Sequence, residues 1–176
     1  DLSSEMSALI VLATDIEELE AITTIDLLRR AGIEVTVASI TGHKEVKCSR
    51  GVRIVTDKLL EECNESYDVI AIPGGMPGAV NLSKCQPLIQ KMKDQLKAQK
   101  YVAAICASPA VVIEAMGIAE GRKITSFPSF QSQLKNQEAV KQRVVVDNHL
   151  ITSQAPGTAI EFALAIIKEL KGEKTM

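Results

Sequence analysis

The chain has 176 residues, 46% of them hydrophobic and 24% charged, and this length and apolar content suit one compact soluble domain with a sizeable core. Its formal net charge of −2 comes from 20 basic and 22 acidic residues without long runs of one sign, which argues against nucleic acid or a membrane surface as the partner. The sequence contains neither an apolar stretch of membrane-spanning length nor a signal-peptide pattern. We expect a single cytoplasmic domain over residues 1–176, with residues 1–6 an extension or disordered.

The N-terminal half alternates between two hydrophobic periods. The apolar run SALIVLA, residues 7–13, is typical of a buried strand, and apolar residues at helical spacing predict a helix over residues 17–32. A β-branched strand over residues 33–40 follows. Residues 47–57 hold an Arg-Gly pair between two short β-like pieces, which predicts a hairpin. A further strand begins at Tyr67 and ends in the glycine turn PGGMPG.

The C-terminal half continues the alternation of strands and helices. In chain order we expect an amphipathic helix over residues 84–100, a strand over 101–105, a helix from after Cys106 to about Met116, a short strand over 123–126, a hairpin over 143–153 and a closing helix over 157–172. Apolar strands that alternate with helices indicate an α/β fold, with a mostly parallel sheet covered on both faces. Ligands bind at the carboxyl ends of such strands. Three loops should meet there: the one after the first strand, the glycine turn and the turn at Cys106.

Cys106 allows two interpretations. A free cysteine often packs as a small buried hydrophobe. Alternatively, Cys106 sits on a sharp strand-to-helix turn, a nucleophile elbow, where the small neighbours Ala104, Ala107 and Ser108 tolerate crowding. A following helix would then lower the thiol pKa. The four cysteines, at positions 48, 63, 85 and 106, form no C-x-x-C pair and no zinc-like spacing, so we expect reduced thiols and no metal site.

A reactive thiol needs a proton partner. Glu17 and Glu20 are three residues apart and share one face of the first helix, whereas Glu18 points elsewhere. A glutamate beside a thiolate would share a proton with it, because adjacent negative charges raise each other's pKa. A Cys-His pair with His149 is the alternative. The glycine turn lacks the signatures of nucleotide-binding loops, and its glycines are better explained by a close approach of the backbone to Cys106.

Several segments together resemble a known family. ALIVLATDIEELEAITTIDLLRRAGIEVTVAS, VKCSRGV, YDVIAIPGG, VAAICASP and ITSQAPGTAIEFAL are similar to segments of the DJ-1/ThiJ/PfpI superfamily, most nearly of the branch with the Parkinson-disease-associated protein and the bacterial ThiJ-like proteins. The resemblance runs from about Ser7 to about Gly172. It implies a flavodoxin-like three-layer α/β sandwich with a mostly parallel central sheet and a nucleophile elbow, usually as a homodimer. The printed sequence stops at Met176, before the position of the further C-terminal helix common in that branch.

The resemblance also implies roles for individual residues. Cys106 matches the reactive cysteine and Glu20 the glutamate that bonds its sulfur, and the backbone donors and substrate-binding positions around them are Gly75, Ala107 and Gly74. Residues beside the pocket or the dimer interface are Glu17, Arg30, Arg50, Phe127 and Pro156. Phe127 replaces a histidine of many relatives. Ala107 stands where protease-like relatives carry histidine, so peptidase activity is not expected.

The activity implied by the resemblance is that of a glutathione-independent glyoxalase or deglycase. Its substrates would be small reactive carbonyls such as methylglyoxal, with lactate as product and no metal or organic cofactor required. The cell would gain protection against oxidative and carbonyl stress. Two alternatives stay open: a redox sensor in which Cys106 is oxidised to sulfinate, and a chaperone-like module, which would need an exposed apolar patch.

Overall fold

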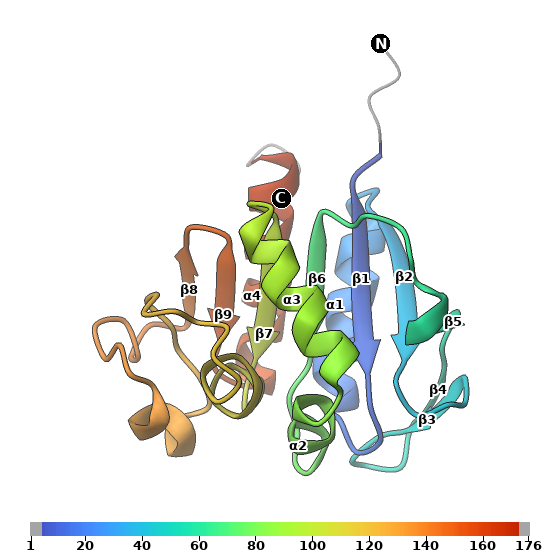
Figure 1. The fold of residues 1–176 in the computed structure, drawn as a ribbon, viewed down its shortest axis with the longest axis horizontal. Coiled ribbons are helices and arrows are strands. Elements are labelled where there is room, and N and C mark those ends of the chain that lie inside the picture. Colours follow the sequence, from blue (N-terminus) through green and yellow to red (C-terminus); the bar gives the residue numbers. More distant parts are fainter. Residues whose placement is uncertain (1–4, 173–176) are drawn as a thin grey trace.

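The computed structural model describes residues 5–172, and within that range seven strands form one central sheet in the order β5-β2-β1-β6-β7-β9-β8 (Figure 1). The strands are β1 (Ser7–Leu12), β2 (Glu34–Ser39), β5 (Lys58–Leu59), β6 (Val69–Ile72), β7 (Tyr101–Ile105), β8 (Val144–Asp147) and β9 (Leu150–Ser153). Neighbouring strands are parallel, except that β8 and β9 are antiparallel. The predicted α/β fold with a mostly parallel sheet is confirmed.

Helices cover both faces of this sheet. α1 (Glu18–Arg30) and α4 (Ala159–Lys171) pack side by side on one face, whereas α2 (Gly78–Ser83) and α3 (Gln86–Lys97) lie on the other (Figure 1). Short helical turns of the described chain are η1 (Leu60–Glu62), η2 (Pro109–Glu114), η3 (Pro128–Gln133) and η4 (Pro156–Thr158). This arrangement is the expected three-layer sandwich.

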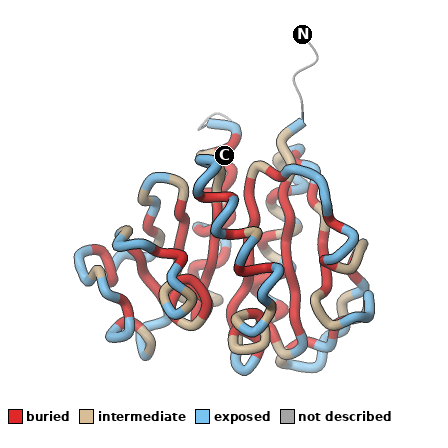
Figure 2. Tube along the Cα trace, viewed as in Figure 1, coloured by how far each residue is buried: buried red, intermediate tan, exposed pale blue. Residues whose placement is uncertain are grey.

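The central strands β1, β6 and β7 are buried along almost their whole length (Figure 2). Strands with helices on both sides bury both of their faces, so they are continuous apolar runs rather than alternating ones. Met6, just before β1, also packs against the core, and its carbonyl accepts a hydrogen bond from the Glu34 amide. Met6 therefore packs with the domain, and because residues 1–4 lie outside the described chain, the expectation for that end stays a prediction.

The predicted hairpin is present beside the edge of the sheet (Figure 1). Its antiparallel strands are β3 (Glu45–Lys47) and β4 (Arg53–Val55). Two backbone hydrogen bonds of 2.9 Å tie it to the loop after β1: the Asp15 amide donates to the Lys47 carbonyl, and the Ser49 amide donates to the Ile16 carbonyl. The hairpin is thus attached to the loop that leads into α1.

One local prediction is right in place but not in type, and another is wrong. The helix expected after Cys106 is present as η2, but it is wound as a π-helix, in which the amide of Ala115 bonds the carbonyl five residues back rather than four. The strand expected over residues 123–126 does not form, because the Thr125 amide donates to the Thr152 hydroxyl instead of a carbonyl of β9. Between residues 5 and 172, no helix is long and apolar enough to cross a membrane.

Candidate active site

The chain turns sharply after β7, at Cys106. The φ angle of Cys106 is +68°, in the left-handed region that residues with side chains rarely occupy. Such a conformation costs about 1–3 kcal/mol and persists where the surroundings impose it. Two backbone hydrogen bonds do so here: the Cys106 amide donates to the Ser153 carbonyl at 3.0 Å, and the Phe127 amide donates to the Cys106 carbonyl at 2.7 Å. The predicted elbow is therefore present, at the carboxyl edge of the sheet.

The Glu20 carboxyl group lies near this thiol, in the first turn of α1, and has no exposed surface. Its Oε1 accepts a 2.8 Å hydrogen bond from the Gly74 amide, whereas Oε2 is buried with no regular hydrogen-bond partner in the described chain. Burial raises the pKa of Glu20 to about 7, against the lowering effects of the Gly74 amide and of the nearby Cys106 thiol. The thiol thus lowers the pKa of the carboxyl group, although it makes no regular hydrogen bond to Oε2.

The Cys106 thiol is buried but not sealed, since the residue keeps 9% exposure. Burial, with the charge and hydrogen bonding of Glu20, raises the pKa of the thiol to about 12, although the Gly75 and Ala107 amides lower it. The helix that follows Cys106 is expected to lower the pKa of its thiol. This expectation is wrong beside ionised Glu20, because the effects of burial and of the carboxylate charge on the thiol are larger than those of the amide groups. Because ionised Glu20 raises the pKa of the thiol, loss of the second proton from the pair is disfavoured. A single proton shared between the two groups stays a prediction.

The glycine turn approaches the elbow so closely that no side chain would fit. A Cβ atom on Gly74 would lie 2.6 Å from the Cys106 Cβ, and one on Gly75 would lie 2.6 Å from the Glu17 nitrogen. Gly75 also has φ +91°, which favours glycine. The predicted close approach of backbone to Cys106 is confirmed, and it brings the Gly74 and Gly75 amides beside the two reactive groups.

The neighbouring glutamates have different surroundings. Glu17 caps α1, and its amide donates to the Gly74 carbonyl at 2.9 Å, so it belongs to the site. Glu18 is buried and points to the hairpin, where its carboxylate accepts hydrogen bonds from the Ser49 hydroxyl and from the amides of Arg50 and Val52. Burial opposes ionisation of Glu18, but these hydrogen bonds prevail and lower its pKa. Glu18 is therefore an ionised anchor of the hairpin, turned away from Cys106 as its spacing predicts.

Other predicted site residues lie at different distances from the elbow. Phe127 is exposed and adjoins Cys106 through its amide, and Pro156 begins η4, just after β9. Arg30 lies on the outer side of α1, paired with Asp26, and Arg50 is exposed on the hairpin turn. The structure does not bring either arginine to the thiol within this single chain.

The histidine alternative is excluded by position. The His149 ring packs on Tyr101, with 4.8 Å between ring centroids, at the start of β7, and Cys106 follows the opposite end of that strand. Within residues 5–172, no three histidine, cysteine or acidic side chains gather in a way that could hold a metal ion. Glu20 is the titratable partner of the thiol.

Sequence reasoning missed several groups that hold the site together. The Ser153 carbonyl restrains Cys106, and the buried Ser108 hydroxyl donates to the Pro73 carbonyl at 2.6 Å, which joins the elbow to the glycine turn. Gly78 packs against the backbone of Ile16. The third glycine of PGGMPG was the signal for Gly78, whereas no sequence pattern indicates that β9 lies beside β7.

Comparison with known proteins places this architecture among relatives. Residues 6–169 match the DJ-1/PfpI family. The chain is 44% identical over 167 residues to Protein DJ-1 homolog B of Arabidopsis thaliana, covering 94% of this chain but 38% of that relative. It is 38% identical to the glutathione-independent glyoxalase DJR-1.2 of Caenorhabditis elegans, covering 99% and 94% of the two chains. The solved structure of oxidised Toxoplasma gondii DJ-1 superposes with a TM-score of 0.94 at 44% identity, covering 97% of this chain and 93% of the other.

Proposed function

This chain belongs to the DJ-1/PfpI family, and from that premise we propose that it is a glutathione-independent glyoxalase and deglycase for methylglyoxal-type carbonyls. The similarity to a Caenorhabditis elegans protein named as such a glyoxalase supports the proposal. The physiological role is protection against oxidative and carbonyl stress in the cytoplasm. Because the chain spans 38% of its Arabidopsis relative, the proposal concerns the reaction that this domain can carry out.

One observation carries the proposal: a strained thiol, buried with 9% exposure, lies beside a fully buried carboxyl group that has an oxygen unpaired in the described chain. Cys106 supplies the nucleophile, and Glu20, whose pKa is raised to about 7, can both donate and accept a proton near neutral pH. A general acid and base works best with a pKa close to the operating pH. A purely structural thiol would need neither the left-handed backbone nor this partner.

The first half of the reaction forms a covalent adduct. With the proton on Glu20, the Cys106 sulfur attacks the aldehyde carbon of methylglyoxal, a carbon–sulfur bond forms, and the carbonyl electron pair moves to oxygen. The amides of Gly75 and Ala107, which already act on the sulfur, are placed to stabilise the developing oxyanion. Glu20 then gives its proton to that oxygen, which leaves a neutral hemithioacetal and an ionised carboxylate.

The second half moves hydrogen between the two substrate carbons. Ionised Glu20 removes the proton from the carbon bound to sulfur, giving an enediolate, and returns a proton to the neighbouring carbon. The hydroxyl proton of the first carbon passes to the oxygen of the second, so the product is a lactoyl thioester, an isomer of the hemithioacetal. Water then attacks the thioester carbon, the carbon–sulfur bond breaks, and lactate leaves with the thiol restored. Deglycation would use the same attack on carbonyl adducts of amines or thiols.

Lactate production from methylglyoxal without glutathione tests this function. We expect turnover in the unmodified protein and its loss in Cys106→Ser and Glu20→Gln. Cys85→Ser is the matched control, because Cys85 is a half-exposed thiol on another helix terminus, and it should keep full activity. A folded, unmodified protein that produces no lactate would contradict the proposal, and so would full activity in either site variant.

A redox sensor is the second candidate, and the free Oε2 of Glu20 favours it. When protonated, that oxygen can donate a hydrogen bond to a sulfinate formed on the neighbouring Cys106. Peroxide is the oxidant: each of two equivalents transfers one oxygen atom to sulfur and leaves as water. Mass measurement after peroxide treatment should show two added oxygens on Cys106 before Cys48, Cys63 or Cys85. Equal oxidation of all four thiols would refute this role.

The proposed assembly is a homodimer. Ile22 of α1 and Val52 and Val55 of the hairpin line an open apolar groove of about 700 Å³, with Arg30 at its side, and Val55 is 72% exposed. Exposed apolar patches of this kind mark interaction surfaces. A second copy seated there would cover the patch and bring Arg50 of the same hairpin to the interface. A chaperone-like function would instead leave the patch open. Binding of a hydrophobic dye to the assembled protein would then indicate the chaperone-like function, whereas lack of binding would indicate a patch covered by the second copy.

A further inference from the structure

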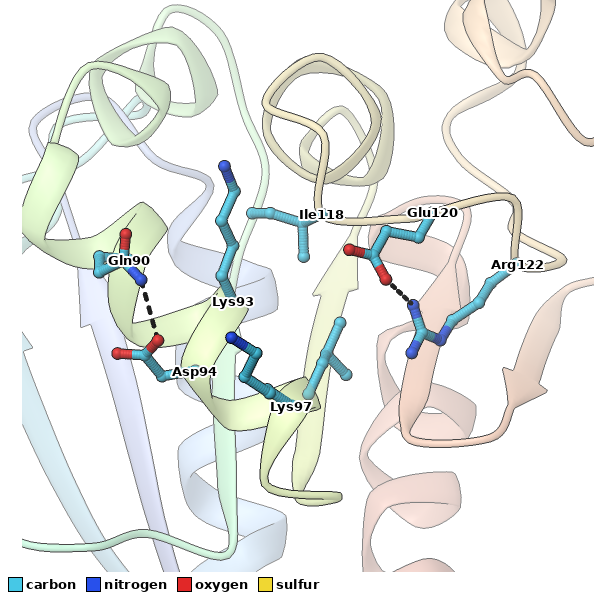
Figure 3. Close-up of a pocket in the computed structure, with 8 residues that line it drawn as sticks. Gln90, Lys93, Asp94, Lys97, Ile118, Glu120 and Arg122 are labelled. Carbon is cyan, nitrogen blue, oxygen red and sulfur yellow. Dashed lines mark hydrogen bonds and ion pairs between the residues drawn. The ribbon is translucent and has the colours of Figure 1, made fainter.

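A separate polar cavity of about 280 Å³ lies between α3 and the loop that follows η2 (Figure 3). α3 contributes Lys93 and Lys97 to the lining of this cavity, and the loop contributes Arg122. The buried residues Leu96 and Ile118 provide apolar surface between them. Cys106 and Glu20 are not among the residues that line this cavity, so it needs its own explanation.

Positive charge predominates in this cavity. Lys93 and Lys97 make no ion pair within the described chain, and they stand four residues apart on one helix face, where like charges destabilise each other. Two carboxylates also line the cavity: Asp94 accepts a 2.9 Å hydrogen bond from the neutral side-chain amide of Gln90, and Glu120 pairs with Arg122 at 3.8 Å. Three basic and two acidic side chains therefore leave the cavity with an excess of one positive charge.

Arg122 is held in place before any ligand arrives. Its side chain is only 20% exposed, and its Nη1 donates to the Ala119 carbonyl at 3.1 Å. Its Nε is buried without an acceptor in the described chain, and its Nη1 lies 3.8 Å from the exposed Glu120 carboxylate. The turn that positions it is strained, with φ +50° at Glu120. A fixed cation of this kind binds an anion without the entropic cost of ordering a flexible side chain.

We propose that this cavity binds a small molecule that carries a phosphate group. A multiply charged anion matches two ammonium groups and one guanidinium, all of which donate hydrogen bonds to phosphate oxygens. The apolar surface of Leu96 and Ile118 suits the carbon part of an ester. The volume of about 280 Å³ is at the small end of ligand pockets, which fits a small metabolite rather than a macromolecule.

Calorimetric titration with pyrophosphate at constant ionic strength tests the proposal, with citrate as the carboxylate comparison. The key variant is Lys93→Gln with Lys97→Gln, because both side chains are exposed and their loss should not unfold the protein. The matched control is Lys44→Gln with Lys141→Gln, which removes the same charge from exposed positions outside the cavity. We expect saturable binding of pyrophosphate, weakened at least tenfold in the cavity variant and unchanged in the control.

Three results would overturn the proposal: no saturable binding by the unmodified protein, equal weakening in both double variants, or citrate binding as tightly as pyrophosphate. Arg122→Lys adds a test of geometry, since it keeps the charge but loses the guanidinium that the Ala119 carbonyl holds in place, and it should bind pyrophosphate several-fold more weakly. The thermal midpoint of the Arg122→Lys variant, measured in parallel, shows whether weaker binding comes from the lost contact or from unfolding. Because these titrations do not involve Cys106, they succeed or fail independently of the glyoxalase proposal.

Discussion

Replacement of Gly74 by alanine tests whether close packing of the glycine turn on the elbow assembles the site. The added Cβ would lie 2.6 Å from the Cys106 Cβ, 2.7 Å from the Ile105 carbonyl oxygen and 2.9 Å from the Ala107 nitrogen. Two of these are backbone atoms of the elbow, which cannot move without disturbing β7. Overpacking of this kind costs about 1–3 kcal/mol. Displacement of the Gly74 amide also weakens its hydrogen bond to Glu20, worth about 1.5–3 kcal/mol when the acceptor is charged.

We therefore expect Gly74→Ala to lower the free energy of unfolding by about 3 kcal/mol, or the thermal midpoint by about 6–12 °C. Lactate production and alkylation of Cys106 by iodoacetamide should each slow at least about tenfold, because the thiol and carboxyl group no longer meet correctly. The matched control is Gly157→Ala, where an added Cβ meets no atom within 4 Å, and its stability should change by less than about 0.5 kcal/mol. If Gly74→Ala unfolds at the same denaturant concentration as Gly157→Ala and alkylates at the same rate, the packing argument is wrong.

Three further predictions concern single residues. Glu20→Gln removes a carboxyl group whose pKa in the folded protein, about 7, exceeds its ordinary value of 4.5. The free energy of unfolding of the unmodified protein, relative to the variant, should therefore fall by about 3 kcal/mol as pH rises through that interval. Denaturant unfolding at several pH values measures this difference, and a difference that does not change with pH would contradict the prediction. Glu18→Ala leaves the donors of the hairpin turn unpaired and should cost about 1–3 kcal/mol, against almost nothing for exposed Glu34→Ala. Val55→Asp should convert the proposed dimer to monomer in light scattering, whereas Val146→Asp on the opposite edge strand should not; a monomeric unmodified protein would contradict the assembly.

Much of the fold follows from local patterns along the chain. The unbroken apolar runs at β1, β6 and β7 are a direct consequence of helices on both faces, so the α/β class and the parallel sheet could be predicted from them. The errors lie where packing overrides the local pattern. η2 is wound as a π-helix, and residues 123–126 bond a side chain instead of a strand.

The candidate site divides in the same way. Helical periodicity was enough to put Glu17 and Glu20 on one face and Glu18 on another, and small residues around Cys106 indicated the elbow. The direction of the thiol pKa could not be predicted, because it depends on burial and on a carboxylate 86 positions away in the sequence. The choice between Glu20 and His149 likewise depended on which end of β7 each residue approaches.

The sequence by itself determined the order and type of the main elements, the strained cysteine as candidate nucleophile, and the family. These depend on neighbours within a few residues, whose spacing is visible in the chain. Only the tertiary structure decided that β9 restrains the elbow through Ser153 and that the Glu18 carboxylate accepts hydrogen bonds from the hairpin. It also decided that Lys93, Lys97 and Arg122 line one cavity. Contacts between distant residues depend on the order of strands in the sheet, and the desolvation of a side chain depends on what packs around it. Local periodicity therefore cannot predict either of them.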